Sequence, residues 1–181
     1  YVYEGEKITI GQPIAEVASR NKPIIMSTGG ATLSEVELAL NTIYKHHTEV
    51  SLMHCLIKYP AEFEDANLRI MNTLKQAFGV PVGFSNNGFR DKNGEIDYEE
   101  IPSAVSQLGA DLYEIHITLN REMDGVDQGF STEPEELKKM ISLMNNNREK
   151  YLKLSNEHLT ESQLDRTKKL KNELNKLGYQ A

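Results

Sequence analysis

The chain has 181 residues, enough for one compact domain with a sizeable hydrophobic core. Hydrophobic residues make up 39% and charged residues 26%, as in ordinary globular proteins, and no apolar run approaches the ~20 residues of a membrane helix. The net charge of −7 argues against general nucleic-acid binding, which needs a basic surface. The single cysteine, Cys55, excludes an intramolecular disulfide and favours a cytoplasmic location.

Four short apolar runs predict β-strands at residues 23–27, 50–56, 80–85 and 110–117. Their starts are 27, 30 and 30 residues apart. Amphipathic helical periodicity follows the strands at residues 34–47, 66–78 and 132–144. Residues 1–11 suggest one more strand end, leading into a helix at residues 13–20. The chain therefore repeats a strand–helix unit.

Two of these helices carry start signals. Thr32 and Glu35 have the spacing of a capping box, which satisfies backbone N–H groups of the first turn. Thr132 is followed by Glu133 and Pro134, residue types that favour the first turn of a helix. We therefore predict Thr132 as the N-cap of the last helix.

Strand–helix units of ~30 residues with nearly continuous apolar strands are typical of a parallel sheet covered by helices. A doubly wound sheet and a (β/α)₈ barrel both fit this α/β pattern. In both architectures, ligands bind at the carboxyl ends of the strands. Those ends are polar here, at residues 27–30, 57–60, 85–88 and 114–116. A ligand site is therefore expected along this edge of the sheet.

Glu114 and His116 alternate along the last predicted strand, so their side chains point to the same face. Such a pair could bind a divalent metal ion or transfer a proton. A structural hydrogen bond between the two explains the pattern equally well. Asp127, in the glycine-containing loop that follows, is either a ligand-facing carboxylate or a turn former.

Two further strand regions have competing interpretations. His54 lies within an apolar run and is predicted to be a core histidine. The turn at residues 27–30 could hold a phosphate or carboxylate with its backbone amides. Its glycines could equally serve only the geometry of the turn.

Residues 145–181 are charged and helical, with Leu170, Leu174 and Leu177 on one side. They form either a solvated helix that docks through its leucines or a helix that contacts a partner subunit. We predict a domain at residues 1–144 and a charged helical tail at residues 145–181.

The strand ends and helices at residues 22–40, 54–85 and 108–141, taken together, resemble the sialic acid (N-acetylneuraminate) synthases, including the legionaminic and pseudaminic acid synthases and spore-coat polysaccharide relatives. The resemblance runs from about Gly5 to Ile141. It implies the C-terminal part of a (β/α)₈ TIM barrel, from about strand 4 to strand 8. It also implies a homodimeric transferase of carbohydrate biosynthesis that condenses phosphoenolpyruvate with an N-acylated hexosamine. A divalent metal, Mn²⁺ or Mg²⁺, would polarise the sugar aldehyde.

The resemblance also implies roles for individual residues. Ser27 and Ser85 are expected to bind phosphoenolpyruvate, while Tyr59 and Asp127 face the sugar. His116 matches a metal ligand, and Asn87 stands where the family has a second metal-binding histidine. With Glu114, which strand alternation places beside His116, we predict Glu6 and Asp127 as the catalytic carboxylates.

The chain departs from the family pattern at several of these positions. Asn86-Asn87 replaces Asp-His, and Tyr1 to Glu6 replaces Lys-Ile-x-Ser-Gly-Glu. Ile57 replaces a polar residue, and Ile115 replaces a basic one. Three functions therefore stay open: a synthase of the sialic acid type, a relative that binds a sugar or anion without turnover, and a different reaction on the same barrel.

Overall fold

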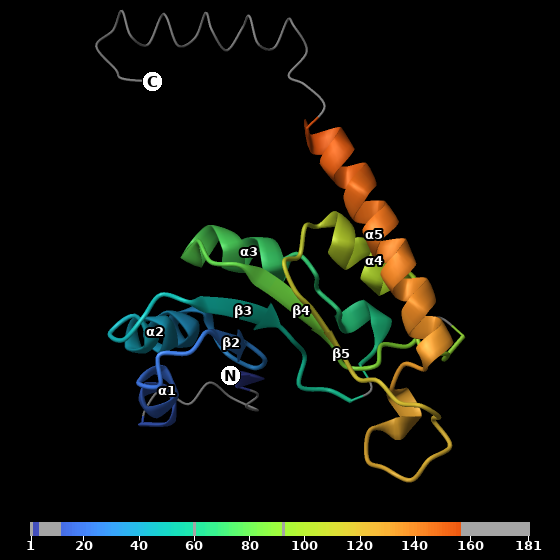
Figure 1. Cartoon of the computed structure of the whole chain (residues 1–181), viewed down its shortest axis with the longest axis horizontal. Coiled ribbons are helices and arrows are strands. Elements are labelled where there is room, and N and C mark those ends of the chain that lie inside the picture. The colour runs from blue at the N-terminus through green and yellow to red at the C-terminus, as the bar shows by residue number, and fades with distance from the viewer. Residues whose placement is uncertain (1, 4–11, 60, 92, 157–181) are drawn as a thin grey trace, which may run out of the picture. The chain divides into compact units, whose positions relative to one another are not determined.

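The computed structural model describes residues 2–3, 12–59, 61–91 and 93–156 (Figure 1). Contacts within the chain define two compact units, residues 1–147 and 148–181, and the fold and site described below belong to the first. Glu6 lies outside the described residues. None of the described helices has the length and apolar content that a lipid bilayer requires.

Five parallel strands form one sheet: β1 (Val2–Tyr3), β2 (Ile24–Ser27), β3 (Val50–His54), β4 (Val82–Asn86) and β5 (Tyr113–Ile115). Their spatial order is the order of the sequence, β1-β2-β3-β4-β5 (Figure 1). The α/β class and the parallel sheet predicted from the sequence are confirmed. A doubly wound sheet reverses its strand order at a switch point, so this unbroken order favours winding of the barrel type.

The described part of the chain contains five helices, four between successive strands and one after β5: α1 (Gln12–Ala18), α2 (Leu33–Ile43), α3 (Ile70–Phe78), α4 (Glu100–Gln107) and α5 (Pro134–Asn156). Two short 3₁₀ helices, η1 (Phe63–Asp65) and η2 (Gln128–Phe130), interrupt the loops. The predicted capping box of α2 is confirmed, because the Thr32 side chain accepts from Glu35 N and the Glu35 side chain accepts from Thr32 N.

Helix α4 was not predicted from the sequence pattern. It has only eight residues, with Pro102 in its first turn. Its start is held by the buried carboxylate of Asp97, which accepts hydrogen bonds from the backbone N–H groups of Glu99, Glu100 and Ile101. These bonds satisfy amides that have no partner within the helix.

The predicted N-cap of the last helix is wrong. Helix α5 begins at Pro134, and Thr132 is instead buried in a parallel bridge to Ile117. There Thr132 N donates to His116 O at 2.9 Å, and Thr118 N donates to Thr132 O at 3.0 Å. This tertiary contact overrides the local capping preference. Helix α5 also continues through residue 144, and the division of the chain at that position stays a prediction.

The helix predicted at residues 66–78 begins later, at Ile70. Asn67 has a φ of 41°, a left-handed conformation that a right-handed helix does not contain. The chain therefore passes through η1 and a turn before α3 starts.

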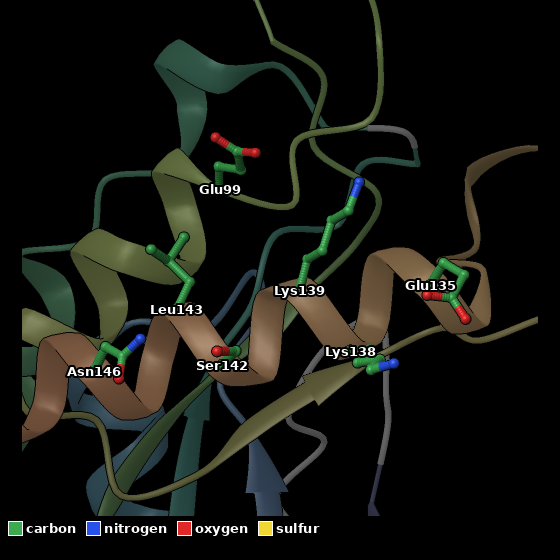
Figure 2. Close-up of a pocket in the computed structure, with 7 residues that line it drawn as sticks. All are labelled: Glu99, Glu135, Lys138, Lys139, Ser142, Leu143 and Asn146. Carbon is green, nitrogen blue, oxygen red and sulfur yellow. The ribbon is translucent and has the colours of Figure 1, made fainter.

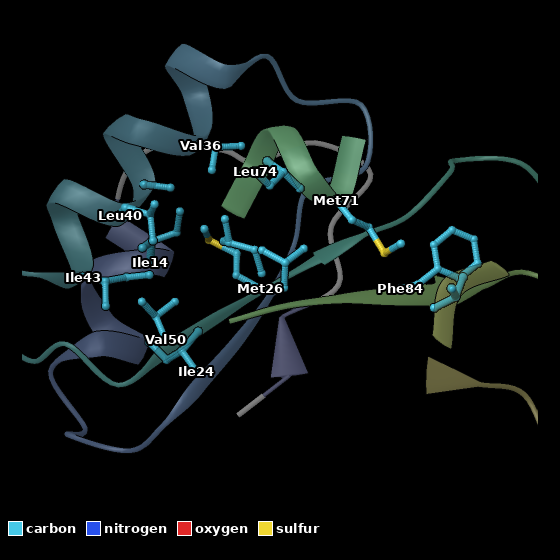
Figure 3. Close-up of a cluster of buried hydrophobic side chains, with 14 of the residues drawn as sticks. Ile14, Ile24, Met26, Val36, Leu40, Ile43, Val50, Met71, Leu74 and Phe84 are labelled. Carbon is cyan, nitrogen blue, oxygen red and sulfur yellow. The ribbon is translucent and has the colours of Figure 1, made fainter. Parts of the chain in front are cut away.

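The hydrophobic core lies between the helices and one face of the sheet (Figure 3). Alternate strand residues supply it, among them Ile24, Met26, Val50, Leu52, Val82 and Phe84. Because successive strand side chains point to opposite faces, Ser27, Ser85 and Glu114 belong to the other face. Packing one face therefore determines which polar groups the other face presents.

His54 is a core histidine, as predicted. Its side chain is 3% exposed, and its ring packs at a tilt against Phe84 with 5.6 Å between centroids. Its Nε2 atom lies 2.9 Å from Ala66 O, so it donates a hydrogen bond to that carbonyl. Burial lowers the pKa of His54 below its ordinary 6.5, and the bond to Ala66 opposes the shift only in part.

The lowered pKa of His54 predicts a pH dependence of stability. The unfolded chain binds the proton more tightly, so the free energy of unfolding should fall as pH decreases below about 6.5, until the folded-state pKa is passed. His54→Gln should remove this contribution to the dependence of the free energy of unfolding on pH. Urea unfolding at a series of pH values around and below 6.5 measures it. The exposed His46 supplies the control, and the account is wrong if His46→Gln flattens the slope as much as His54→Gln.

Candidate active site

Two neighbouring strand ends bring four polar side chains together on the open face of the sheet. Ser85 pairs with Glu114 in the register of β4 and β5, and Asn86 pairs with Ile115. Asn87 and His116 are the next residues of the two segments, one step beyond the last of these pairs. By alternation they share the face of Ser85 and Glu114.

The Ser85 hydroxyl donates a hydrogen bond to Glu114 Oε1 at 2.5 Å. Ser85 is 6% exposed, and a hydrogen bond of this length to a carboxylate is a strong one. Its hydroxyl proton is therefore directed at Glu114. The Ser85 hydroxyl would donate a hydrogen bond to a phosphate only if it rotated away from Glu114. Its oxygen can still accept a hydrogen bond from another group.

Asn87 is 1% exposed, so the polar atoms of its amide are shielded from water. Its Nδ2 donates to Leu56 O and lies 3.8 Å from Cys55 Sγ, which fixes the orientation of the amide. Its Oδ1 is buried without a hydrogen-bond partner in the described part of the chain. A buried oxygen without a partner costs about 1–3 kcal/mol, so Asn87 Oδ1 is available to accept a hydrogen bond or to bind a cation.

The preceding residue, Asn86, has a structural role. Its Nδ2 donates to the Tyr113 hydroxyl at 2.6 Å, and its Oδ1 accepts from Gly88 N and Phe89 N at 2.9 and 3.3 Å. Burial raises the pKa of Tyr113 well above its usual value, so this hydroxyl stays protonated. Of the two amides that follow Ser85, Asn86 shapes the turn and only Asn87 has an unused atom.

His116 lies in a group of three aromatic rings beside a carboxylate. Its ring centroid is 5.1 Å from Phe130 and 6.2 Å from Tyr59, both in edge-on contacts. Asp127 Oδ2 lies 3.7 Å from His116 Nδ1. A carboxylate on this side favours the tautomer with its proton on Nδ1, which leaves Nε2 able to bind a metal or accept a proton.

Phe130 rests on Gly88 and connects the β4 end to the loop after β5. Gly88 has a φ of 68°, and a Cβ atom added to it would lie 2.6 Å from the Cβ of Phe130. Only glycine therefore fits this position. Sequence reasoning missed Phe130, because its contacts come from distant parts of the chain.

The predicted site residues divide into groups. The structure brings Ser85 together with Glu114, and Tyr59 and Asp127 together with His116. Glu114 and His116 do not form the hydrogen bond predicted as an alternative, because Glu114 pairs with Ser85 and His116 lies beside Asp127. Ser27 lies on the same face at the end of β2, where its hydroxyl accepts from Gly29 N at 3.4 Å. Strand β3 separates it from β4, so about 10 Å lies between the two backbones.

The donor atoms fit a metal only in part. Among the described residues, no three histidine, cysteine or acidic side chains converge as a metal site. His116 Nε2 and Asn87 Oδ1 are an imidazole nitrogen and an amide oxygen, which suit a hard or borderline divalent cation. Such an ion would take its other ligands from water, substrate or other parts of the protein.

A groove elsewhere on the unit has no residue in common with this cluster. It lies between Glu99, before α4, and the α5 residues Lys138, Lys139 and Leu143 (Figure 2). Acidic and basic side chains both line it. The polar strand ends, and not this groove, contain the groups suited to chemistry.

The NeuB family model matches residues 5–156, and the chain belongs to the NeuB family. The N,N'-diacetyllegionaminic acid synthase of Campylobacter jejuni is 41% identical over 132 residues, which cover 71% of this chain and 37% of that protein. The spore coat polysaccharide biosynthesis protein SpsE of Bacillus subtilis is 39% identical over 127 residues, covering 69% and 32%. The resemblance noted in the sequence is confirmed.

Solved structures agree with this assignment. The crystal structure of SpsE from Bacillus subtilis matches with a TM-score of 0.71 at 33% identity, over 83% of this chain and 41% of that one. The N-acetylneuraminic acid synthetase of Leptospira borgpetersenii, in complex with citrate, matches with a TM-score of 0.70 at 29% identity, over 90% and 54%. The sheet is thus a half-barrel of the NeuB synthase type. The chain spans about a third of the length of the curated relatives named above.

Two glycines with left-handed backbone allow the Gly88–Phe130 contact to be tested. Gly79, with a φ of 64°, has open space around its Cβ position, so Gly79→Ala should cost only the backbone strain of about 1–2 kcal/mol. Gly88→Ala should cost at least about 1 kcal/mol more, because it also displaces Phe130. Urea unfolding of the two variants measures the difference, and equal losses would show that Phe130 does not rest on Gly88.

Proposed function

We propose that this protein is a nonulosonic acid synthase, which condenses phosphoenolpyruvate with an N-acylated hexosamine. The observation that carries the proposal is the convergence of Ser85, Asn87, Glu114 and His116 at one sheet edge in a chain of the NeuB family. The names of its relatives, a legionaminic acid synthase among them, support the substrate class.

We propose further that the chain supplies about strands 4 to 8 of a (β/α)₈ barrel. Five parallel strands in sequence order support this, as does the match to only part of each related structure. Strands β1 and β5 are the two edges of the described sheet, so a closed barrel requires further strands. A homodimer in the cytoplasm completes the proposal, and both features rest on the family resemblance and the composition alone.

The proposed reaction forms a carbon–carbon bond. The terminal carbon of phosphoenolpyruvate attacks the aldehyde carbon of the open-chain sugar, and the aldehyde oxygen takes a proton to become a hydroxyl. Water adds to the central carbon of phosphoenolpyruvate and loses a proton. Phosphate then leaves, and the central carbon becomes a ketone. The product is a nine-carbon α-keto acid.

The described residues have distinct parts in this scheme. Ser85 and Ser27 bind phosphoenolpyruvate on the open face of the sheet, and Glu114, 2.5 Å from the Ser85 hydroxyl, supplies the carboxylate that takes up the proton lost by water. Tyr59 and Asp127 bind the sugar beside His116, since both lie against that ring. Glu6 supplies a further carboxylate in this proposal.

A divalent metal, Mn²⁺ or Mg²⁺, is the proposed cofactor. His116 Nε2 and Asn87 Oδ1 would hold it, and it would supply Lewis acidity toward the sugar aldehyde. The support is the buried Oδ1 atom of Asn87, which has no partner among the described residues and directly follows β4, the neighbour of the strand that precedes His116.

The activity is tested by phosphate release in the full-length protein. Release from phosphoenolpyruvate should require both an N-acylated hexosamine and a divalent metal, and the preferred sugar identifies the acceptor. Glu114→Gln should slow release by about 100-fold or more, because it removes a proton acceptor. The exposed Glu37→Gln variant is the control. Absence of release with every sugar, in protein shown to be folded, contradicts the proposal.

The metal site is tested by Mn²⁺ titration, which needs no turnover. Asn87→Ala and His116→Ala should each weaken binding by about tenfold or more, since each removes one of two protein ligands. His46→Ala removes an exposed imidazole and should leave the affinity unchanged. Equal affinities in the wild type, Asn87→Ala and His116→Ala would place the metal elsewhere or exclude it.

A relative that binds a sugar or anion without turnover is the second candidate. Two observations favour it: Asn87 stands where a metal-binding histidine is expected, and the Ser85 proton is directed at Glu114. This candidate predicts binding of phosphoenolpyruvate or sugar by calorimetry without any phosphate release.

A further inference from the structure

The loop between β5 and α5 carries Asp127 and is fastened at its base. A parallel bridge joins Ile117 to Thr132, and hydrogen bonds link the two arms on either side of it. Beyond this base the loop is open to solvent, with Met123 51% and Val126 98% exposed. The bridge alone therefore does not explain how Asp127 keeps its place beside His116.

Arg121 ties the outgoing arm of this loop to the start of α5. Its guanidinium donates two hydrogen bonds to the carboxylate of Glu136, one of them at 2.5 Å to Oε2. Its backbone N–H donates to Glu133 Oε1 at 2.9 Å. Glu136 Oε2 also accepts from Glu133 N at 3.0 Å, which joins Glu133, just before α5, to Glu136 in the first turn of the helix.

This ion pair is the least exposed of those between described residues. The side chains of Arg121 and Glu136 are 27% and 19% exposed, whereas those of Arg20 and Glu16 are 61% and 65% exposed. A two-point contact between planar groups also sets the orientation of the arginine, which a single contact does not. Partial burial reduces solvent screening, so this pair holds its geometry better than a surface pair does.

A chain of contacts leads from Arg121 to the site. Its Nη1 also donates to Ser131 O at 3.3 Å, on the returning arm of the loop. Ser131 is buried, and its hydroxyl donates to Asp127 O at 2.7 Å. The Asp127 side chain then lies 3.7 Å from His116 Nδ1.

We propose that Arg121 is a positioning residue: through Glu136 and Ser131 it fixes the β5–α5 loop so that Asp127 stays beside His116. Arg121 does not touch the reacting atoms. It acts on the acceptor side of the site, because Asp127 belongs to the sugar-binding half in the proposed function. A purely structural role at the start of α5 is the alternative, and it predicts a loss of stability with no effect on Asp127.

The first test is hydrogen exchange of the loop amides in the full-length protein, and it does not depend on any activity. In Arg121→Gln, amides of residues 122–131 should exchange about tenfold faster than in the wild type, because the loop loses its tie to α5. Arg20→Gln breaks an exposed ion pair far from the loop in sequence and should leave these amides unchanged. If exchange rises only within α5, Arg121 stabilises the helix alone and the inference is wrong.

The second test rests on the proposed function. Arg121→Gln should raise the KM for the sugar by about tenfold while the KM for phosphoenolpyruvate changes less than about twofold, because only the Asp127 side loses its position. Ser131→Ala leaves the ion pair in place, removes the hydroxyl hydrogen bond to Asp127 O and should reproduce the sugar effect. Equal changes in both KM values contradict the inference. If the wild type shows no turnover, the proposed function fails and the exchange measurement still decides the role of Arg121.

Arg121→Lys covers the case in which Arg121→Gln does not fold. Lysine keeps the charge but loses the two-point contact with Glu136 and the reach to Ser131 O. Exchange of residues 122–131 should then rise by a smaller factor than in Ser131→Ala or Arg121→Gln. Wild-type exchange in both Arg121→Lys and Ser131→Ala overturns the inference.

Discussion

The register between β4 and β5 is the constraint on which the site depends. It pairs Ser85 with Glu114 and Asn86 with Ile115, and Asn87 and His116 follow directly after these pairs. A slip of one residue would turn Glu114 and His116 toward the helices and move the Ser85 hydrogen bond out of reach. What prevents the slip is the other face of the sheet, where Phe84 packs into the hydrophobic core. The apolar face thus determines the geometry of the polar one.

A series of contacts leads from these two strand ends through the turn at Gly88. The Asn86 side-chain oxygen accepts a hydrogen bond from Gly88 N within that turn. Phe130 packs so closely against Gly88 that a side chain at position 88 would clash with it. Phe130 in turn holds the ring of His116 edge-on. The loop that supplies Phe130 also supplies Asp127, and Arg121 joins it to α5. A strand end, a turn and a loop therefore behave as one unit around His116.

Much of the fold was predictable from the sequence, because strand alternation and helical periodicity are local. The same alternation placed Glu114 and His116 on one face. Sequence patterns failed where contacts with distant residues determine the local structure. Thr132 pairs with Ile117 and does not cap α5. The Leu56 carbonyl orients the Asn87 amide. The contacts of Phe130 and Arg121 are of the same kind. No sequence period marks them, because each joins segments with unrelated local structure.

The most direct measurement of the central claim follows the carbon–carbon bond itself. Phosphoenolpyruvate labelled with ¹³C at its terminal carbon would be incubated with the full-length protein, metal and the preferred N-acylated hexosamine, and the products analysed by NMR and mass spectrometry. The account predicts the label inside a nine-carbon α-keto acid, bonded to the former aldehyde carbon. Label recovered only in pyruvate or in unreacted phosphoenolpyruvate would contradict it.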